Sequence, residues 1–278
     1  MLTLLISSPI DMNATPGASL PMQPKYAPIA VTRKISSAMM RCELTHLQRT
    51  PIDVALAREQ HHAYEQALRA LGCRIESLPE EPELPDSVFV EDTAVVLDRV
   101  AVITRPGAPS RRAETASIAA VLGKYRDVVR IESPGTLDGG DVLRVGRTLY
   151  VGASGRSNVG GIEQLGALLL PFDYRVLRVA VRDCLHLKSA VTQVAADALL
   201  INSRWVERQQ FPGMRFIEVD ESEPFGANAL LLGSGVIHSS SHPRTAEALR
   251  RHGIRLHTVA MSETEKAEGA VTCCSLLL

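Results

Sequence analysis

The sequence predicts an α/β fold built from a repeated unit of two strands and a helix. Four stretches contain two short runs rich in Val, Ile and Leu joined by a tight polar turn, which is the pattern of a β-hairpin. They span residues 93–106, 141–152, 194–203 and 228–240. Their spacing of several tens of residues is typical of repeat architectures. The alternative is one doubly wound α/β sheet, but the sequence contains no glycine-rich phosphate loop of the kind found in many such sheets.

Helical segments lie between these hairpins. Thr50 as N-cap, Pro51 at the first helical position and Gly72 beyond the end predict a helix between them. Similar signals mark 110–125 and 242–253, while internal glycines weaken the candidate at 156–170.

The two ends of the predicted domain are both strand-like. YAPIAVTR (26–33) and VTCCSLLL (271–278) are expected to pair and complete a fifth unit, which would place the terminal cysteines near the axis of a closed sheet. Side chains alternate between the faces of a strand, so only one of the two thiols can line a site. Cys273, which would share its face with Ser275, is the candidate, and Cys274 is expected to pack as a small hydrophobic residue.

Composition limits the classes of partner. The chain has 278 residues and a net charge of −1, with acidic and basic residues interspersed, so neither nucleic acid nor a membrane surface is an expected partner. A small molecule is favoured. Five cysteines, an odd number with no zinc-binding CxxC pairs, predict a reduced, cytoplasmic location. We expect residues 1–25 to be a flexible N-terminal extension and residues 26–278 to form a single catalytic domain.

Acidic residues gather in two motifs. DSVFVEDTAVV places Asp86, Glu91 and Asp92 around a predicted VFV strand, and TLDGGDVL places Asp138 and Asp141 around two glycines. Acids that flank a strand often serve only solubility, and Asp-Gly is a common turn. Carboxylates at a strand end are also where ligand sites form.

His186 lies between two leucines in CLHLKS. Such a histidine is usually a hydrogen-bonded core residue. Beside a thiol, it could instead move protons while the thiolate attacks an electrophilic carbon.

The order of motifs DSVFVEDTAVV, ITRPGAPSRRAE, LDGGDVL, VGASGRSN, LHLKS and MSETEKAEGAVTCCS resembles that of the dimethylarginine dimethylaminohydrolases, over about residues 31–278. That family belongs to the guanidino-group-modifying enzymes. The resemblance implies a five-bladed, pseudo-symmetric α/β propeller (pentein) of ββαβ units. It also implies hydrolysis of asymmetric dimethylarginine or monomethylarginine to citrulline and a methylamine, through a covalent thiouronium on the cysteine.

The resemblance also implies roles for individual residues. The catalytic residues would be Cys273, His186 and Asp138, with Asp138 orienting the histidine and, together with Asp92, holding the guanidinium. The other substrate contacts would be Asp86 at the methylated end with its neighbour Glu91, Arg111 and Arg156 at the α-carboxylate, and the backbones of Leu44 and Ala267.

The reaction that the resemblance implies requires no metal or organic cofactor, and zinc is expected only as an inhibitor. The partner is a small-molecule substrate, and the protein is expected to be a monomer or a homodimer. Two alternatives remain. One is an arginine deiminase or amidinotransferase on the same fold, and the other is a catalytically silent homologue that binds arginine-like ligands.

Overall fold

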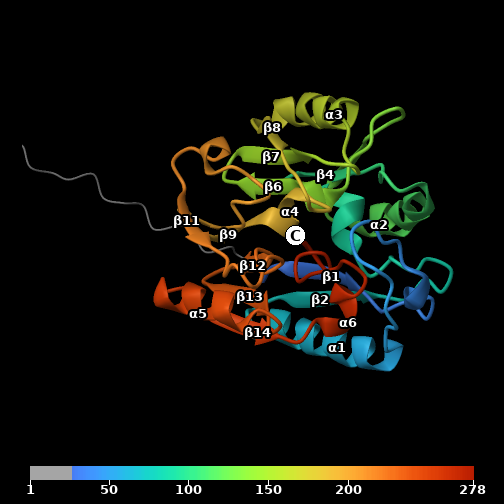
Figure 1. Ribbon diagram of the computed structural model, residues 1–278. Helices are drawn as coiled ribbons and strands as arrows, with labels where there is room; N and C mark the ends of the chain where they lie inside the picture. Colours follow the sequence, from blue (N-terminus) through green and yellow to red (C-terminus); the bar gives the residue numbers. More distant parts are fainter. Residues whose placement is uncertain (1–26) are drawn as a thin grey trace, which may run out of the picture.

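The computed structural model describes residues 27–278, so the extension predicted at residues 1–25 lies outside the described residues. Five three-stranded sheets surround a common axis (Figure 1). In each sheet, the first strand of the unit pairs antiparallel with the middle strand, and the middle strand pairs parallel with the third. The repeat architecture is confirmed, and the single doubly wound sheet is wrong.

The sheets are made of β3 (Ala94–Val96), β4 (Val100–Ile103) and β5 (Asp127–Arg130); β6 (Val142–Val145), β7 (Thr148–Ala153) and β8 (Arg175–Ala180); β9 (Val191–Ala195), β10 (Ala198–Ile201) and β11 (Arg215–Glu218); β12 (Ala229–Leu232), β13 (Gly235–Ser239) and β14 (Leu256–Val259); and β15 (Leu276–Leu277), β1 (Ile29–Arg33) and β2 (Arg74–Leu78). The four hairpins expected from the sequence are all present.

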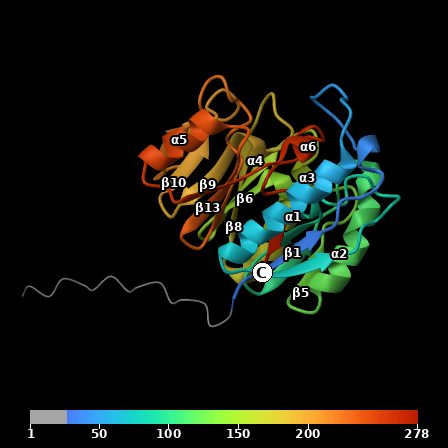
Figure 2. The same ribbon diagram turned by 90° about the horizontal axis from the view of Figure 1, so that it is seen from below.

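Four helices lie on the outside of the ring: α1 (Val54–Ala70), α2 (Thr115–Leu122), α3 (Val159–Leu169) and α5 (Pro243–Arg251) (Figures 1 and 2). Each connects the middle strand of a unit to its third strand, as a parallel pair requires. In the unit of β9 to β11, the 3₁₀ turn η6 (Arg208–Gln210) takes the helix position. Short helices α4 (Leu187–Ala190) and α6 (Ser262–Glu265) and 3₁₀ turns η1 (Met39–Arg41), η2 (Val90–Thr93), η3 (Pro109–Glu114), η4 (Gly139–Asp141) and η5 (Leu170–Phe172) complete the described elements.

The first strand of every unit faces the axis. A cavity of about 390 Å³ is lined by residues of β3, β6, β9, β12 and β15. The apolar core is divided into five clusters, because each sheet buries side chains against its neighbours and its outer helix. This arrangement brings the segments that precede the five first strands to one end of the axis.

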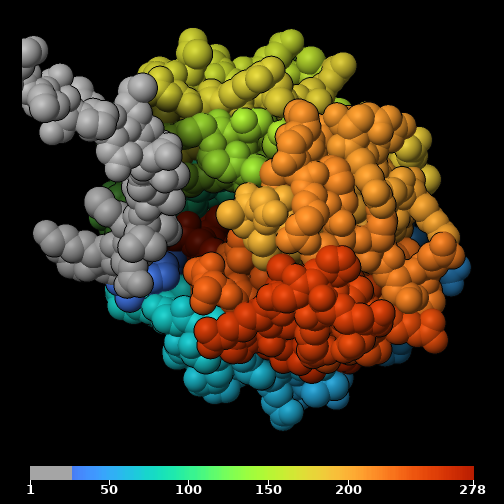
Figure 3. Space-filling model, turned by 90° about the vertical axis from the view of Figure 1, so that its left-hand side faces the viewer, coloured from blue at the N-terminus to red at the C-terminus, as the bar shows by residue number. Residues whose placement is uncertain are grey.

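The fifth unit joins the two ends of the described chain, as predicted. Ala30 pairs with Leu277 and Val31 with Leu276, so β15 completes the sheet of β1 and β2. Figure 3 shows the last residues, in dark red, deep in a hollow between the green, cyan and orange segments.

Local predictions fail at three places. Cys273 and Cys274 lie in a turn before β15 rather than in the strand, so strand alternation does not set their directions. The VFV segment is a turn leading into η2, not a strand. Helix α1 begins after Asp53, whose carboxylate accepts hydrogen bonds from the amides of Ala55 and Leu56, so Thr50 is not its N-cap.

Within residues 27–278, none of the helices combines the length and apolar character needed to cross a bilayer.

Candidate active site

The candidate catalytic residues share one position in the repeat, just before a first strand. Asp92 lies in η2 before β3, Asp138 precedes η4 and β6, and His186 is the N-cap residue of α4 before β9. Asn228 precedes β12, and Cys273 lies in the turn before β15. Because the first strands surround the axis, residues as far apart in the sequence as Asp92 and Cys273 meet at one end.

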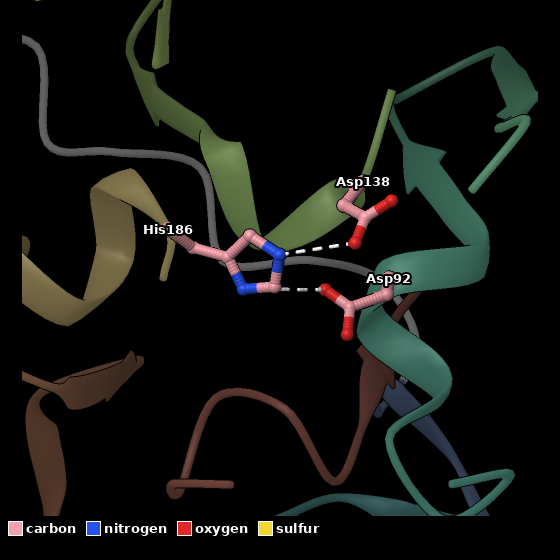
Figure 4. A group of neighbouring side chains, drawn as sticks. All are labelled: Asp92, Asp138 and His186. Carbon is pink, nitrogen blue, oxygen red and sulfur yellow. Dashed lines mark hydrogen bonds and ion pairs between the residues drawn. The ribbon is translucent and has the colours of Figure 1, made fainter. Parts of the chain in front are cut away.

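The imidazole of His186 faces two carboxylates, those of Asp138 and Asp92 (Figure 4). Its Nε2 is 3.0 Å from Oδ2 of Asp138, and its Nδ1 is 3.9 Å from Oδ1 of Asp92. Burial lowers the pKa of His186, but Asp92, the hydrogen bond with Asp138 and the charge of Asp141 outweigh it and raise that pKa to about 9. The site therefore holds an imidazolium at neutral pH, which can donate a proton.

Backbone amides fix both carboxylates. Gly107 donates to Oδ1 of Asp138 at 2.8 Å, and Gly140 donates to Oδ1 of Asp92 at 3.0 Å. A Cβ atom at Gly140 would lie 2.6 Å from Nδ1 of His186 and 2.7 Å from Oδ1 of Asp92. The second glycine of LDGGD is thus required by the close approach of these two side chains, and the motif is more than a turn.

Asp92 remains a carboxylate despite its burial. Burial raises the pKa of this group, but His186, Arg111 and the amide of Gly140 outweigh that effect and lower the pKa to about 2. Its negative charge raises the pKa of both the His186 imidazole and the Cys273 thiol.

Cys273 is half-buried, and its backbone is tied to the acidic motif by the amide of Glu91, which donates to the carbonyl oxygen of Cys273 at 3.1 Å. Burial, followed by the charges of Glu91 and Asp92, raises the pKa of its thiol to about 12. Among the described residues, no hydrogen bond joins this thiol to His186. Cys274 is fully buried, as expected of a packed thiol.

Glu91 is enclosed rather than open to a ligand. Its Oε1 lies 2.5 Å from Nζ of Lys188, and its Oε2 accepts from the hydroxyl of Thr272 at 2.7 Å. Asn228 accepts from the amide of Thr272 and donates to the hydroxyl of the same residue, both at 3.0 Å. The predicted substrate contact at Glu91 thus lies in a network that holds the turn at residues 271–274, which carries Cys273. Glu91, Lys188 and Thr272 also line the axial cavity.

Arg111 is neither a surface charge nor a freely exposed anion receptor. Its guanidinium is buried, and Nη1 lies 2.6 Å from Oδ2 of Asp92. Nε and Nη2 bind both carboxylate oxygens of Glu114, at 3.2 and 2.8 Å, and Nη2 also donates to the carbonyls of Asp86 and Phe89. Among the described residues, every N–H group of this guanidinium has a partner except one at Nη1, and that group is the one able to bind a ligand.

Arg156 lies nearer the surface and links the catalytic cluster to a loop above it. Its Nη1 is 3.7 Å from Oδ2 of Asp138, and its Nη2 donates to the hydroxyl of Thr45 at 3.0 Å. Asp86, whose pKa burial raises, accepts from the amide of Glu43 at 3.0 Å. The partly buried Leu44 is therefore held between a carboxylate and a guanidinium.

Glu268 completes the support of this loop. Its carboxylate accepts hydrogen bonds from the amides of Thr45, His46 and Leu47 at 2.5 to 3.0 Å. Ala267, the other predicted backbone contact, is the buried neighbour of Glu268. The two predicted backbone contacts thus come from segments joined by Glu268.

A cavity of about 190 Å³ lies beside these segments. Its lining includes His46 and Leu47 of the loop, Leu185 next to His186, and Ala270 and Val271, which lead into Cys273. Neither Cys273 nor His186 lines it, so it adjoins the catalytic cluster without containing it.

Asp92, Asp138 and His186 are also the described residues with the geometry for a metal. Two carboxylate oxygens and one ring nitrogen lie within 4.8 Å of one another, a donor set that suits a divalent cation such as zinc. The positive charges of Arg111 and Arg156 already neutralise the carboxylates of Asp92 and Asp138, so these carboxylates do not need a cation to balance their charge.

Sequence reasoning missed five members of the site: Glu114, Lys188, Asn228, Thr272 and Glu268. Lys188 carried a usable signal, because a charged residue in the short segment that leads into a buried strand needs a partner. Asn228 carried another, since it occupies the same place before a first strand as Asp92 and His186. Glu114 pairs locally with Arg111, three residues before it, whereas the contacts of Thr272 and Glu268 depend on partners that only folding brings together.

Comparison with known proteins agrees with this arrangement. A family model described as eukaryotic N,N dimethylarginine dimethylhydrolase matches residues 43–210. The chain is 43% identical over 253 residues to an N(G),N(G)-dimethylarginine dimethylaminohydrolase of Streptomyces coelicolor, covering 90% of this chain and 96% of that protein. It is 39% identical to the enzyme of the same name from Pseudomonas aeruginosa, covering 81% and 89%.

Among solved structures, the chain resembles a cysteine-to-serine mutant of the Pseudomonas aeruginosa protein complexed with citrulline. The TM-score is 0.87 at 35% identity, covering 91% of this chain and 100% of the other. The agreement of sequence, fold and site shows that the chain belongs to the dimethylarginine dimethylaminohydrolase family.

Proposed function

We propose that this protein hydrolyses Nω-methylated arginines, asymmetric dimethylarginine and monomethylarginine, to L-citrulline and a methylamine. The observation that carries the proposal is the pairing of His186 with Asp138 and Asp92, where the charge of Asp92 also acts on the thiol of Cys273, in a member of this family.

The substrate is a cation at one end and a carboxylate at the other. Asp92 and Asp138 would hold the guanidinium nitrogens and keep the group protonated, which leaves its central carbon electron-poor. Asp86 would face the methylated end, with Glu91 supporting the same motif from within its buried network. Each of these assignments places a protein carboxylate beside the positively charged guanidinium end of the substrate.

The amino-acid end would meet Arg156, assisted by the N–H group at Nη1 of Arg111. The backbones of Leu44 and Ala267 would contact the α-amino group and its surroundings. Because Arg156 already bridges Asp138 and Thr45, the same residue would connect recognition of the carboxylate with the catalytic cluster.

The reaction would proceed in two steps. The thiolate of Cys273 attacks the guanidinium carbon, and the C–N bond to the methylated nitrogen breaks as the His186 imidazolium protonates the departing amine. Water then attacks the thiouronium and gives a proton to the neutral imidazole. The C–S bond breaks, the thiolate is restored, and citrulline leaves as the proton of its new hydroxyl group passes to solvent. Cys273 and His186 supply every group that this sequence needs, so we propose no metal or organic cofactor.

The raised pKa of the thiol has a consequence for this mechanism. A thiol with a pKa of about 12 is almost entirely protonated at neutral pH. A guanidinium bound beside it adds a positive charge that favours the thiolate. The substrate would therefore help to generate its own nucleophile.

We also propose a reducing, cytoplasmic setting for the enzyme. All five cysteines are free thiols, and the nucleophile must remain reduced to act.

The test is citrulline release from asymmetric dimethylarginine and from free arginine by the same preparation, repeated with Cys273→Ser. Release from dimethylarginine that Cys273→Ser abolishes is the expected result. A preference for free arginine would overturn the proposal in favour of a deiminase.

A silent homologue would release nothing from either substrate. Labelling with a 2-chloroacetamidine-type electrophile separates that case, because an active site of the proposed kind alkylates at Cys273 and loses the reaction in His186→Ala. Absence of labelling in the unmodified protein would contradict the mechanism.

A further inference from the structure

Asp141 is the one acid of the LDGGD motif that the proposed chemistry does not use. It is fully buried, and its carboxylate accepts three hydrogen bonds. Oδ2 accepts from the hydroxyls of Ser154 and Ser157, both at 2.6 Å, and Oδ1 accepts from the amide of Leu187 at 2.9 Å. Burying a charged carboxylate costs free energy, so one held by three donors is expected to have a function besides filling space in the core.

The first connection leads to the catalytic pair. The amide of Leu187 follows His186 directly, so its bond to Asp141 fixes the backbone from which the imidazole projects. The hydroxyl of Ser157 accepts from the amide of Asp138 at 3.1 Å while donating to Asp141. Asp141 in turn donates its own amide to the carbonyl of Asp138 at 3.0 Å. The two partners of the His186–Asp138 bond are therefore held by one carboxylate.

The second connection leads to the turn at residues 154–157, which carries Arg156. The hydroxyl of Ser154 accepts from the amide of Arg156 at 3.0 Å and from that of Ser157 at 3.3 Å. Because the Ser154 hydroxyl accepts from two amides, its own proton is available for Asp141. The donor and acceptor in each of these three hydrogen bonds are therefore set. The backbone of Arg156 is thereby placed relative to Asp138.

Close packing leaves this carboxylate little freedom. A Cβ atom at Gly152 would lie 2.7 Å from Oδ1 of Asp141 and 2.9 Å from Cβ of Leu187. Gly152, in the VGAS segment, is thus needed for the approach of β7 to the Asp141–Leu187 contact. The same arrangement prevents Asp141 from reaching a ligand directly.

We propose that Asp141 is a positioning residue with two separable connections, one through Ser157 and Leu187 that holds Asp138 and His186 for chemistry, and one through Ser154 that holds Arg156 for substrate binding. The inference rests on the proposed function, because the two connections are distinguished by their effects on that reaction.

The charge of Asp141 also reaches the imidazole. The carboxylates facing His186 are Asp92 from η2 and Asp138 and Asp141 from the η4 segment, with Arg111 and Arg156 behind the first two. All three carboxylates raise the pKa of His186, so an uncharged residue at 141 removes one of them. The basic limb of the activity profile must then move to lower pH, because His186 loses its proton earlier.

The experiment measures kcat, KM and their pH dependence with asymmetric dimethylarginine for the full chain and four variants. Ser154→Ala is expected to raise KM about 5- to 10-fold with kcat within about 2-fold, as for the loss of one hydrogen bond used in binding. Ser157→Ala is expected to lower kcat by about 5- to 10-fold with KM within about 2-fold. Asp141→Asn combines both effects and shifts the basic limb. Ser154→Thr retains a hydroxyl and should recover the KM of the unmodified protein.

Two controls make the outcome decisive. Ser117→Ala removes a hydroxyl that donates to Glu81 at 2.7 Å, the same type of bond away from the site, and should leave kcat and KM unchanged. The affinity of each serine variant for dimethylarginine, measured in the Cys273→Ser background, shows whether KM reports binding.

The inference is overturned if both serine variants change kcat and KM in the same proportion, or if neither differs from the control. Should Asp141→Asn not fold, the serine variants still decide the matter. No turnover by the unmodified protein would instead contradict the proposed function.

Discussion

Asp92 and Arg111 form a buried ion pair, with 2.6 Å between Oδ2 and Nη1 and side-chain exposures of 4% and 5%. The pair joins the acid proposed to hold the substrate guanidinium to an arginine of the protein itself. The positive charge of Arg111 helps to keep Asp92 ionised at a site that excludes water. Arg111 therefore has a structural function in addition to any contact with the substrate.

The two arginines should respond differently to replacement. Arg111→Met leaves Asp92 and Glu114 without their partner, and removal of one member of a buried pair costs about 3–5 kcal/mol of the free energy of unfolding. Arg156→Met should lower stability by less than about 1 kcal/mol and raise KM for dimethylarginine about 10- to 100-fold, with partial recovery in Arg156→Lys. Urea titration and steady-state kinetics measure both. Equal losses of stability in the two variants would contradict this division.

The adjacent cysteines should also separate. Cys273→Ser is expected to abolish citrulline release while binding of dimethylarginine persists. Cys274→Ala should keep kcat within about 2-fold and reduce the free energy of unfolding by about 1 kcal/mol, because only a small buried group is lost. The measurements are turnover and thermal unfolding of each variant. An inactive Cys274→Ala that folds normally would show that the wrong thiol has been assigned.

The thiol of Cys273 should discriminate between alkylating reagents by charge. With a pKa of about 12, its reaction with neutral iodoacetamide should be slow at pH 7 and accelerate about 10-fold per pH unit as the thiolate fraction rises. A cationic chloroacetamidine should react faster than that fraction allows, because Asp92 and Asp138 bind it. Rates are followed by mass spectrometry, with Cys273→Ser as the control. If the two reagents react with the same pH dependence and at the same rate relative to a free thiol, the bound cation does not help to ionise Cys273.

His186 should make stability depend on alkaline pH. Its pKa rises from 6.5 to about 9 on folding, so its contribution is fully present below pH 6.5 and is lost as the pH rises through 9. The shift corresponds to roughly 3 kcal/mol. The unfolding free energy of the unmodified protein should therefore fall more between pH 6.5 and 9 than that of His186→Gln. Denaturant titrations at both values measure the difference, and identical slopes would show that the imidazole is not held as a cation.

The sequence alone determined the repeating architecture, because hairpin patterns and helix signals are local properties of the chain. It also marked the acids of the two motifs, His186 and Cys273 as candidates, since thiol, imidazole and carboxylate carry reactivity in the residue type itself, and the resemblance to the family singled out Asp92 and Asp138 among the acids. The pairing of the two ends was predictable for a similar reason, as each end has strand character and no local partner.

Tertiary structure decided what these groups contact. Glu91 and Lys188 are 97 residues apart, so no local pattern could pair them. Arg111 pairs locally with Glu114 within η3, but its other carboxylate partner, Asp92, comes from η2. The support of the loop at Thr45 depends on a carboxylate 223 residues away. The cysteines lie in a turn because β15 pairs with β1 only at Leu276 and Leu277, although β1 itself runs from Ile29 to Arg33. Residue type thus set the available chemistry, while closure of the ring set the distances and charges through which it acts.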